Sequence, residues 1–129
     1  LYKKMLAELD LGLDKRLKDK TRYLSGGQRQ ALTLLMAAFH HPKLLLLDEH
    51  TAALDPKTAK KVLELTVKIV GENNLTALMV THNMQQATRI SDKTAFFLLG
   101  EVVEFDDTDK LFSMPSDKRT EDYITGRFG

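Results

Sequence analysis

Two adjacent carboxylates, Asp48 and Glu49, are the residues of this sequence best placed to do chemistry. They follow a run of four leucines, Leu44 to Leu47, which begins shortly after Pro42. A short apolar run bounded by proline and charge predicts a parallel strand that is buried on both faces. Open α/β sheets bind ligands outside the carboxyl ends of their strands. The acid pair would lie at that edge, where an unused carboxylate would be costly to keep.

A serine, two glycines and a glutamine precede a long segment with helical apolar periodicity. Ser25 and Gln28 have the spacing of a capping box, so we expect a helix from Ser25 to His41. Gly26 and Gly27 both fall in its first turn, where each glycine costs about 1 kcal/mol relative to alanine. Two such residues together suggest that another chain or a ligand approaches the backbone closely.

The rest of the sequence predicts alternating helices and strands. Asp55 followed by Pro56 is a strong helix start, and apolar periodicity continues to Gly71. A second buried strand is expected from Leu75 to Thr81, ending at His82. The other expected elements are a helix in residues 1–11, a surface connection over 13–23, a helix over 83–90, a hairpin of 94–99 with 101–105, and short helices from Asp107 or Thr108 to Phe112 and over 120–125.

Composition limits the class of protein. The chain has 129 residues, which allows one domain at most, and a formal net charge of +1 offers no bulk attraction for nucleic acid or anionic lipid. There are no cysteines, which excludes disulfides and thiolate metal sites and fits a reducing compartment. No apolar run approaches the roughly 20 residues of a membrane helix. The first residues lack a signal-peptide pattern and are typical of the interior of a longer protein.

Taken singly, each feature has an ordinary structural explanation. A Ser-Gly-Gly-Gln string is usually a loop, and two acids after a strand are often only its solvated end. A histidine after a strand, such as His82, is more often hydrogen-bonded within the protein than catalytic. His40, His41 and His50 have no partner at ligand spacing.

In combination, the features resemble the C-terminal half of the ATP-binding proteins of ABC transporters. The matching strings are Leu24 to Gln28, the strand that ends at Asp48 and Glu49, Ala53 to Asp55, and the strand that ends at Thr81 and His82. The resemblance implies an α/β fold: a truncated P-loop NTPase-like sheet with flanking helices and a C-terminal β-hairpin. Residues 1–129 would form one partial ABC ATPase domain.

The resemblance also assigns chemical roles to the strand-end residues. Asp48 would match the Walker B aspartate that holds Mg²⁺, which neutralises phosphate charge. Glu49 would be the base that polarises the attacking water, and His82 would contact the terminal phosphate. His50 stands where the family usually has proline, and because it follows the acids we expect a small effect.

Two further segments would lie at a dimer interface. In the family, the signature loop contacts ATP held by the opposite subunit through a helix N-terminus and bare glycine backbone. Its residues here would be Ser25, Gly26, Gly27 and Gln28. Residues Ala53 to Asp55 would form the D-loop, which lies across the same interface, with Asp55 near the nucleotide.

The sequence contains no P-loop. The pattern G-x-x-x-x-G-K-[ST], whose amides and lysine cradle phosphates, is matched by none of its glycines. Only 23 residues precede Leu24, which leaves no room for the Walker A strand, the adenine-stacking aromatic or the glutamine loop. ATP and Mg²⁺ are implied by the family, but we expect this chain alone neither to bind nor to hydrolyse ATP.

The resemblance implies the ATP-hydrolysing subunit of an importer, with a second ATPase subunit and a membrane permease as partners. The expected location is cytoplasmic, peripheral to the inner membrane, without nucleic acid or membrane insertion. Residues 84–129 resemble phosphate-importer ATPases, whereas residues 21–83 look more like another bacterial importer group. We therefore hypothesise a composite chain, by recombination or design, which one homologue matching both parts equally well would refute.

Two other functions remain open. The chain could be a non-catalytic interaction module that associates with a complete ABC ATPase. It could also be half of an SMC or Rad50-like head. However, residues 1–23 are too short to show the required coiled coil, and the net charge of +1 does not indicate DNA binding.

The absent Walker A strand also has a structural consequence. In the family it lies between the strands that correspond here to Leu75–Thr81 and Thr94–Leu99. Its loss would expose two apolar edges, which favour pairing with other strands. We predict that the sheet recloses with these two strands adjacent, or that the edges pair with another chain and the protein self-associates.

Overall fold

The computed structural model describes residues 6–7 and 11–127. The chain divides into two compact units, Leu1–Val80 and Thr81–Gly129. The acid pair and the glycine pair both lie in the first unit, and the assignment of residues 1–129 to one partial domain stays a prediction.

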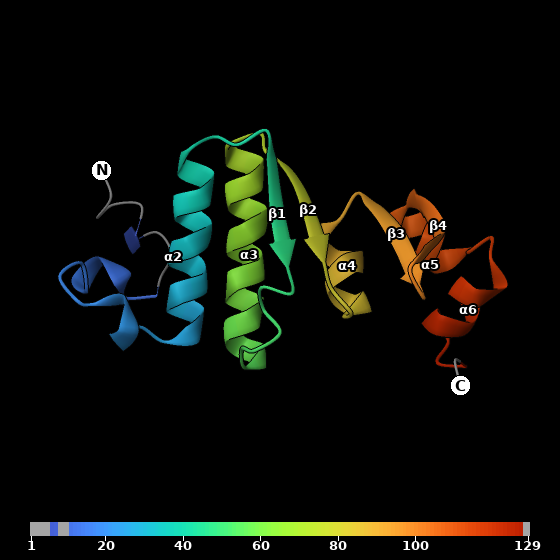
Figure 1. The fold of residues 1–129 in the computed structure, drawn as a ribbon, viewed down its shortest axis with the longest axis horizontal. Helices are drawn as coiled ribbons and strands as arrows, with labels where there is room; N and C mark the ends of the chain where they lie inside the picture. Colours follow the sequence, from blue (N-terminus) through green and yellow to red (C-terminus); the bar gives the residue numbers. More distant parts are fainter. Residues whose placement is uncertain (1–5, 8–10, 128–129) are drawn as a thin grey trace. The chain divides into compact units, whose positions relative to one another are not determined.

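The first unit combines two long helices with two parallel strands. Its elements are α2 (Gly26–Phe39), β1 (Leu44–Asp48), α3 (Pro56–Glu72) and β2 (Thr76–Val80). Both helices run in one direction and both strands in the opposite direction (Figure 1). The strands pair with Leu44 opposite Thr76 and Asp48 opposite Val80. The predicted α/β class is confirmed.

Local side-chain caps explain where the two helices begin. The Ser25 hydroxyl accepts the N–H of Gln28 while the Gln28 side chain accepts the N–H of Ser25, which is the predicted capping box. Asp55 caps α3 in the same way, and Pro56 occupies the first helical position, where its missing N–H is harmless. Both predicted helix starts are confirmed.

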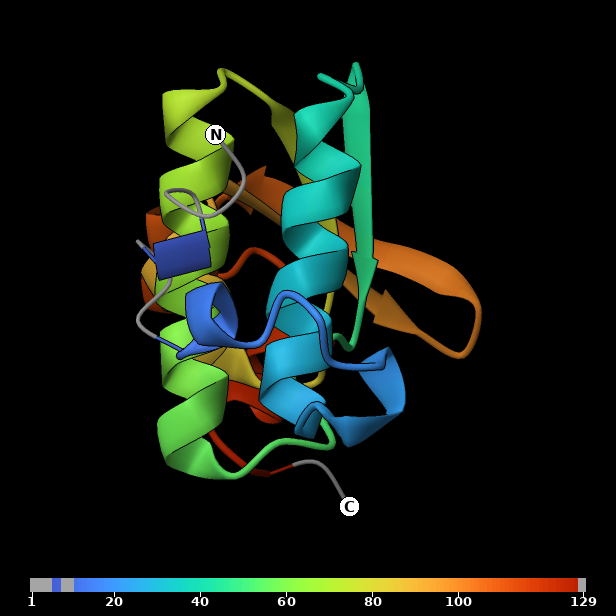
Figure 2. The ribbon, with the colours of Figure 1, turned by 90° about the vertical axis from the view of Figure 1, so that its left-hand side faces the viewer.

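The apolar core of the first unit joins the segment before α2, the two long helices and one face of β1. Figure 2 shows α2 and α3 on the same side of β1 and β2. Among the described residues, the buried core cluster consists of Leu6, Leu13, Leu24, Ala31, Leu34, Ala38, Leu45, Leu65 and Ile69.

The prediction that β1 is buried on both faces is wrong. Leu45 is 5% exposed, whereas its neighbour Leu46 is 66% exposed. Successive side chains of a strand point to opposite faces, and the helices cover only one of them. On the other face Leu44, Leu46, Leu78 and Val80 remain about half or more exposed. The prediction of a second buried strand fails for the same reason.

The segment before α2 is only partly described. Of the helix predicted in residues 1–11, Leu6 and Ala7 are helical, residue 11 is not, and residues 1–5 and 8–10 lie outside the described residues. The connection predicted over 13–23 contains two short 3-10 turns, Leu13–Lys15 and Thr21–Tyr23.

The second unit is a hairpin with three short helices. Its elements are α4 (Met84–Ile90), β3 (Lys93–Leu98), β4 (Glu101–Asp107), α5 (Thr108–Ser113) and α6 (Lys118–Ile124). β3 and β4 pair antiparallel across a two-residue loop, with Leu98 opposite Glu101. Both loop residues, Leu99 and Gly100, have positive φ, which matches the twist of a hairpin turn. The predicted C-terminal hairpin is confirmed.

Two outcomes were predicted for the open edges. Reclosure of the sheet is wrong, whereas pairing of the edges with another chain stays a prediction. The described strands form two separate two-stranded sheets, β1 with β2 and β3 with β4. The hairpin closes over a loop of two residues, so its pairing carries little loop-closure entropy. Both strands of each sheet thus belong to the same unit. None of the helices in the described ranges is both long and apolar enough to span a bilayer.

Candidate functional site

The two predicted acids lie at the carboxyl end of β1, as the sequence indicates. Asp48 is the last residue of the strand, and both it and Glu49 are exposed. The backbone N–H of Glu49 donates to the carbonyl of Val80 at 3.0 Å, so β2 holds the strand end. Glu49 itself has φ of 40°, a left-handed conformation that costs a non-glycine residue roughly 1–2 kcal/mol. A chain reversal therefore begins at Glu49.

His50 anchors this reversal to helix α3. Its Nε2 lies 3.2 Å from the Thr66 hydroxyl, which itself donates to the carbonyl of Val62 at 2.8 Å. Because the Thr66 proton is used there, Nε2 of His50 carries the proton of the histidine–threonine bond. Burial lowers the pKa of His50 and favours this neutral form. His50 is thus a hydrogen-bonded structural histidine, as expected.

Asp55, in the predicted D-loop, caps helix α3 rather than standing free. Its Oδ1 accepts the N–H of Thr58 at 3.1 Å. The pKa of Asp55 lies below its ordinary value, first because the Thr58 hydroxyl donates to the carboxylate and then because the Thr58 N–H does.

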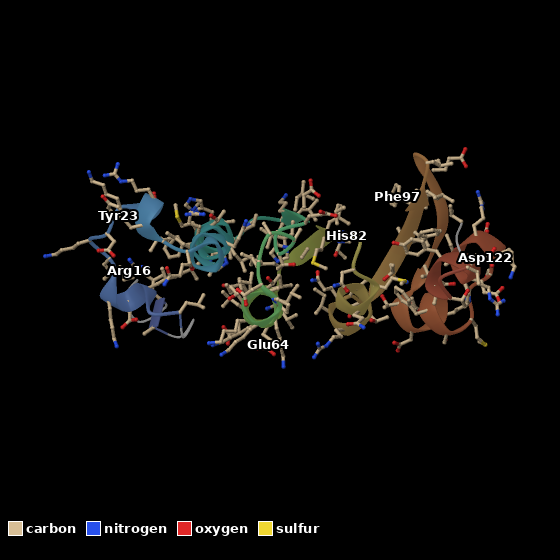
Figure 3. All side chains as sticks on the ribbon, turned by 90° about the horizontal axis from the view of Figure 1, so that it is seen from below. Arg16, Tyr23, Glu64, His82, Phe97 and Asp122 are labelled. Atoms are coloured by element: carbon tan, nitrogen blue, oxygen red, sulfur yellow. The ribbon has the colours of Figure 1, made fainter. Side chains whose placement is uncertain are left out.

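Gln28, in the predicted signature loop, is occupied by contacts within the chain. Its Oε1 accepts the N–H of Ser25 at 2.9 Å and the guanidinium of Arg16 at 3.1 Å. Its Nε2 donates to the carbonyl of Leu11 at 2.9 Å. Figure 3 shows Arg16 on the segment that precedes α2. Gln28 therefore ties that segment to the helix start and holds Ser25 in place.

The two glycines are explained by packing within the chain. A Cβ on Gly27 would overlap Cγ2 of Thr58, at a separation that real atoms do not reach. A Cβ on Gly26 would lie 3.2 Å from Cδ2 of Leu54, which is tighter than an ordinary contact. Close neighbours within the chain, Leu54 of the predicted D-loop and Thr58 of α3, already account for two glycines here, and the approach of another chain or a ligand stays a prediction.

The structure therefore brings the predicted signature loop and the predicted D-loop together, and the two acids lie at the end of β1. His82 follows β2 and belongs to the second unit, next to Asn83, which caps α4 (Figure 3). Sequence reasoning missed Thr58 and Arg16. The position of Thr58, three residues after an N-cap acid, is a local signal that could have been used, whereas nothing in the sequence singles out Arg16.

Comparison with known proteins shows which families and proteins this chain is similar to, and over which residues. The sequence model of the ABC transporter family matches residues 2–52, which include Ser25–Gln28 and the acid pair. The phosphate import ATP-binding protein PstB of Oceanobacillus iheyensis is 55% identical over 114 residues, 88% of this chain and 41% of that protein. The PstB proteins of Bacillus cereus and of Bacillus anthracis are each 57% identical over 117 residues, 91% of this chain and 42% of theirs.

This chain resembles part of an ABC transporter ATPase. It spans about two-fifths of the length of the curated relatives that it matches. A single match of 117 residues takes in most of both residues 21–83 and residues 84–129. A composite origin is therefore not needed to explain the similarity, and a single phosphate-importer relative accounts for both parts.

Proposed function

We propose that this chain is the signature-loop and Walker B part of the ATP-hydrolysing subunit of an ABC importer of the phosphate type. The observation that carries the proposal is the joint arrangement within the first unit. Asp48 and Glu49 end β1, Asp55 caps the next helix, and Ser25 caps the glycine-containing helix that packs on it. The identity to phosphate import proteins supports the substrate class.

The side chains available as ligands decide whether this chain fits the Mg²⁺ and ATP that the resemblance implies. Among the described residues there is no group of three or more side chains that could hold a metal ion by itself. Mg²⁺ is commonly held by one or two carboxylates together with substrate phosphates, so Asp48 fits as one ligand only beside a bound nucleotide. The phosphate-cradling loop is missing from this sequence, so the residues present do not fit ATP on their own.

The roles of the individual side chains follow from this. Asp48 would supply a negative ligand for the metal, and Glu49 would accept a proton from water at the same strand end. His82 would contact the terminal phosphate. Residues Ser25 to Gln28 would present a helix N-terminus to the phosphates of a nucleotide held by a second subunit. The P-loop that completes the site would have to lie outside these 129 residues.

The proposed partners are a second ATPase subunit and a membrane permease, at the cytoplasmic face of the inner membrane. The open apolar face of β1 and β2, with Leu46 66% and Leu78 57% exposed, supports the view that this unit works in an assembly.

Calorimetry tests the first part of the proposal. Titration of MgATP into the chain alone should give no saturable heat at millimolar nucleotide. Tight binding, unchanged in Asp48→Asn, would contradict both the argument from the P-loop and the role of Asp48.

A mixing experiment tests the second part. The chain is combined with a complete PstB subunit, and MgATP-dependent complex formation is followed by analytical ultracentrifugation. Ser25→Arg should abolish the complex, because the bulky cation blocks the phosphate-facing helix start. Asp92→Asn, an exposed acid in a turn of the second unit, is the matched control and should leave the complex intact. Association without nucleotide, or insensitivity to Ser25→Arg, would support a mere interaction module instead.

A further inference from the structure

The close approach of Thr58 to Gly27 is a contact that none of the predicted roles accounts for. Gly27 is buried in the first turn of α2, and Thr58 lies in the first turn of α3. Two of the four predicted signature residues face this junction, because a Cβ on Gly26 would also lie 3.2 Å from Leu54. The junction lies wholly within the first unit.

Thr58 contributes two side-chain groups to the junction, its hydroxyl and its methyl, and its backbone N–H as well. Its hydroxyl donates to the carboxylate of Asp55, and its backbone N–H donates to the same group at 3.1 Å. Its Cγ2 methyl points at Gly27 and would overlap any Cβ there. Threonine is stiff about χ1, so the direction of the hydroxyl sets the direction of the methyl. A rotation that moves the Thr58 methyl must therefore also move the Thr58 hydroxyl.

We propose that Thr58 is a positioning residue that couples the signature loop to the D-loop within one chain. Its hydroxyl fixes the D-loop carboxylate of Asp55, and its methyl sets how closely the helix start at Gly27 approaches. The spacing of the two segments is thereby set before any nucleotide or partner is present. The functional meaning of this coupling rests on the function proposed above.

A double-mutant cycle tests the coupling on the isolated, nucleotide-free chain. Gly27→Ala should lower the melting temperature by about 5 °C or more, because its Cβ meets the Thr58 methyl. Thr58→Ser removes that methyl and keeps the hydroxyl, so the double variant should recover at least half of the loss. Gly71→Ala is the matched control, since a Cβ at Gly71 meets nothing within 4 Å, and Thr58→Ser should not rescue or worsen it. Additive losses in the Gly27 cycle would overturn the proposal.

A spectroscopic readout separates positioning from general packing. The Asp55 carboxyl is titrated by NMR in each variant. Gly27→Ala should turn the Thr58 side chain and raise the Asp55 pKa toward its ordinary value, and adding Thr58→Ser should lower it again. An unchanged Asp55 pKa in a folded Gly27→Ala variant would contradict the coupling.

Two single variants keep the test decisive even where Gly27→Ala does not fold. Thr58→Val keeps the methyl and removes the hydroxyl, so the Asp55 pKa should rise while the Gly27 amide resonance stays near its place. Thr58→Ser keeps the hydroxyl and removes the methyl, so the Asp55 pKa should stay near its value in the unaltered chain while the Gly27 amide resonance moves. If the two variants did not show these opposite patterns, the proposal would be overturned. None of these measurements involves nucleotide, so failure of the proposed function in the mixing experiment leaves their outcome unaffected.

Discussion

The two units of this protein are held together by different means. In the first unit, α2, α3 and β1 enclose a cluster of buried leucines, alanines and an isoleucine. In the second, the largest fully buried side chains among the described residues are Leu111 and Thr120, and Thr108 is 3% exposed. Long helices covering a sheet bury apolar area, whereas short helices around a hairpin have little area to bury.

Buried and half-buried polar contacts join the elements of the second unit. The hydroxyls of Ser91, Thr94 and Thr108 lie within 3.1 Å of one another and join the end of α4 to β3 and α5. Glu104 on β4 accepts the N–H groups of Ser116 and Asp117 and so anchors the start of α6. The comparison teaches that the first unit should respond to lost volume and the second to lost hydrogen bonds or charge.

The largest expected effect comes from removing core volume in the first unit. Leu34 on α2 is 3% exposed, so Leu34→Ala should cost about 2–5 kcal/mol of unfolding free energy through lost transfer energy and a cavity. Leu46→Ala, at 66% exposure, is the control and should cost well under about 1 kcal/mol. Urea unfolding measures both, with NMR signals of the hairpin reporting the second unit. Equal costs for the two variants would break the comparison.

An intermediate effect is expected from the hydroxyl cluster of the second unit. Thr108→Val keeps the shape but leaves Ser91 and Thr94 each without one partner, which should cost about 1–3 kcal/mol. Thr88→Val is the control, because the Thr88 hydroxyl is exposed and bonds only to its own helix. Hydrogen exchange of the β3 and β4 amides measures the loss. If the exchange rates of both variants were the same, the cluster would not stabilise the unit.

The smallest expected effect is a loss of stability in the second unit at low pH, caused by protonation of Asp117. The Arg119 side chain, followed by the Arg119 N–H, lowers the pKa of Asp117 from 3.8 to about 2. Because the pKa is depressed in the folded state, the carboxylate's stabilisation is fully present above pH 3.8 and is lost as the pH falls through about 2. Asp117→Asn should therefore lower the melting temperature of the second unit slightly at pH 5, and the difference from the unaltered chain should shrink as the pH approaches 2 and vanish below it. A pH-independent difference, measured by circular dichroism, would show that the ion pair is not responsible.

Local features could be predicted well from the sequence because each depends on residues close together in the chain. The capping pair Ser25 and Gln28, the start at Asp55 and Pro56, and the hairpin around Gly100 are of this kind. The presence of an α/β fold with a C-terminal hairpin follows from them. The roles of Asp48, Glu49 and His82 rest on the resemblance and remain predictions.

Three other features were decided only by tertiary structure. The exposed face of β1 depends on which helices cover it, and a run of leucines does not reveal this. The separate sheets depend on which strands pair, a choice governed by loop closure and not by strand propensity. The glycine pair was correctly recognised as a close approach, but only the folded chain shows that Leu54 and Thr58 are its neighbours. The sequence by itself determined the caps, the turns and the chemical types at the strand end, because local hydrogen bonds and backbone preferences set them. Packing between distant segments decided what those residues touch.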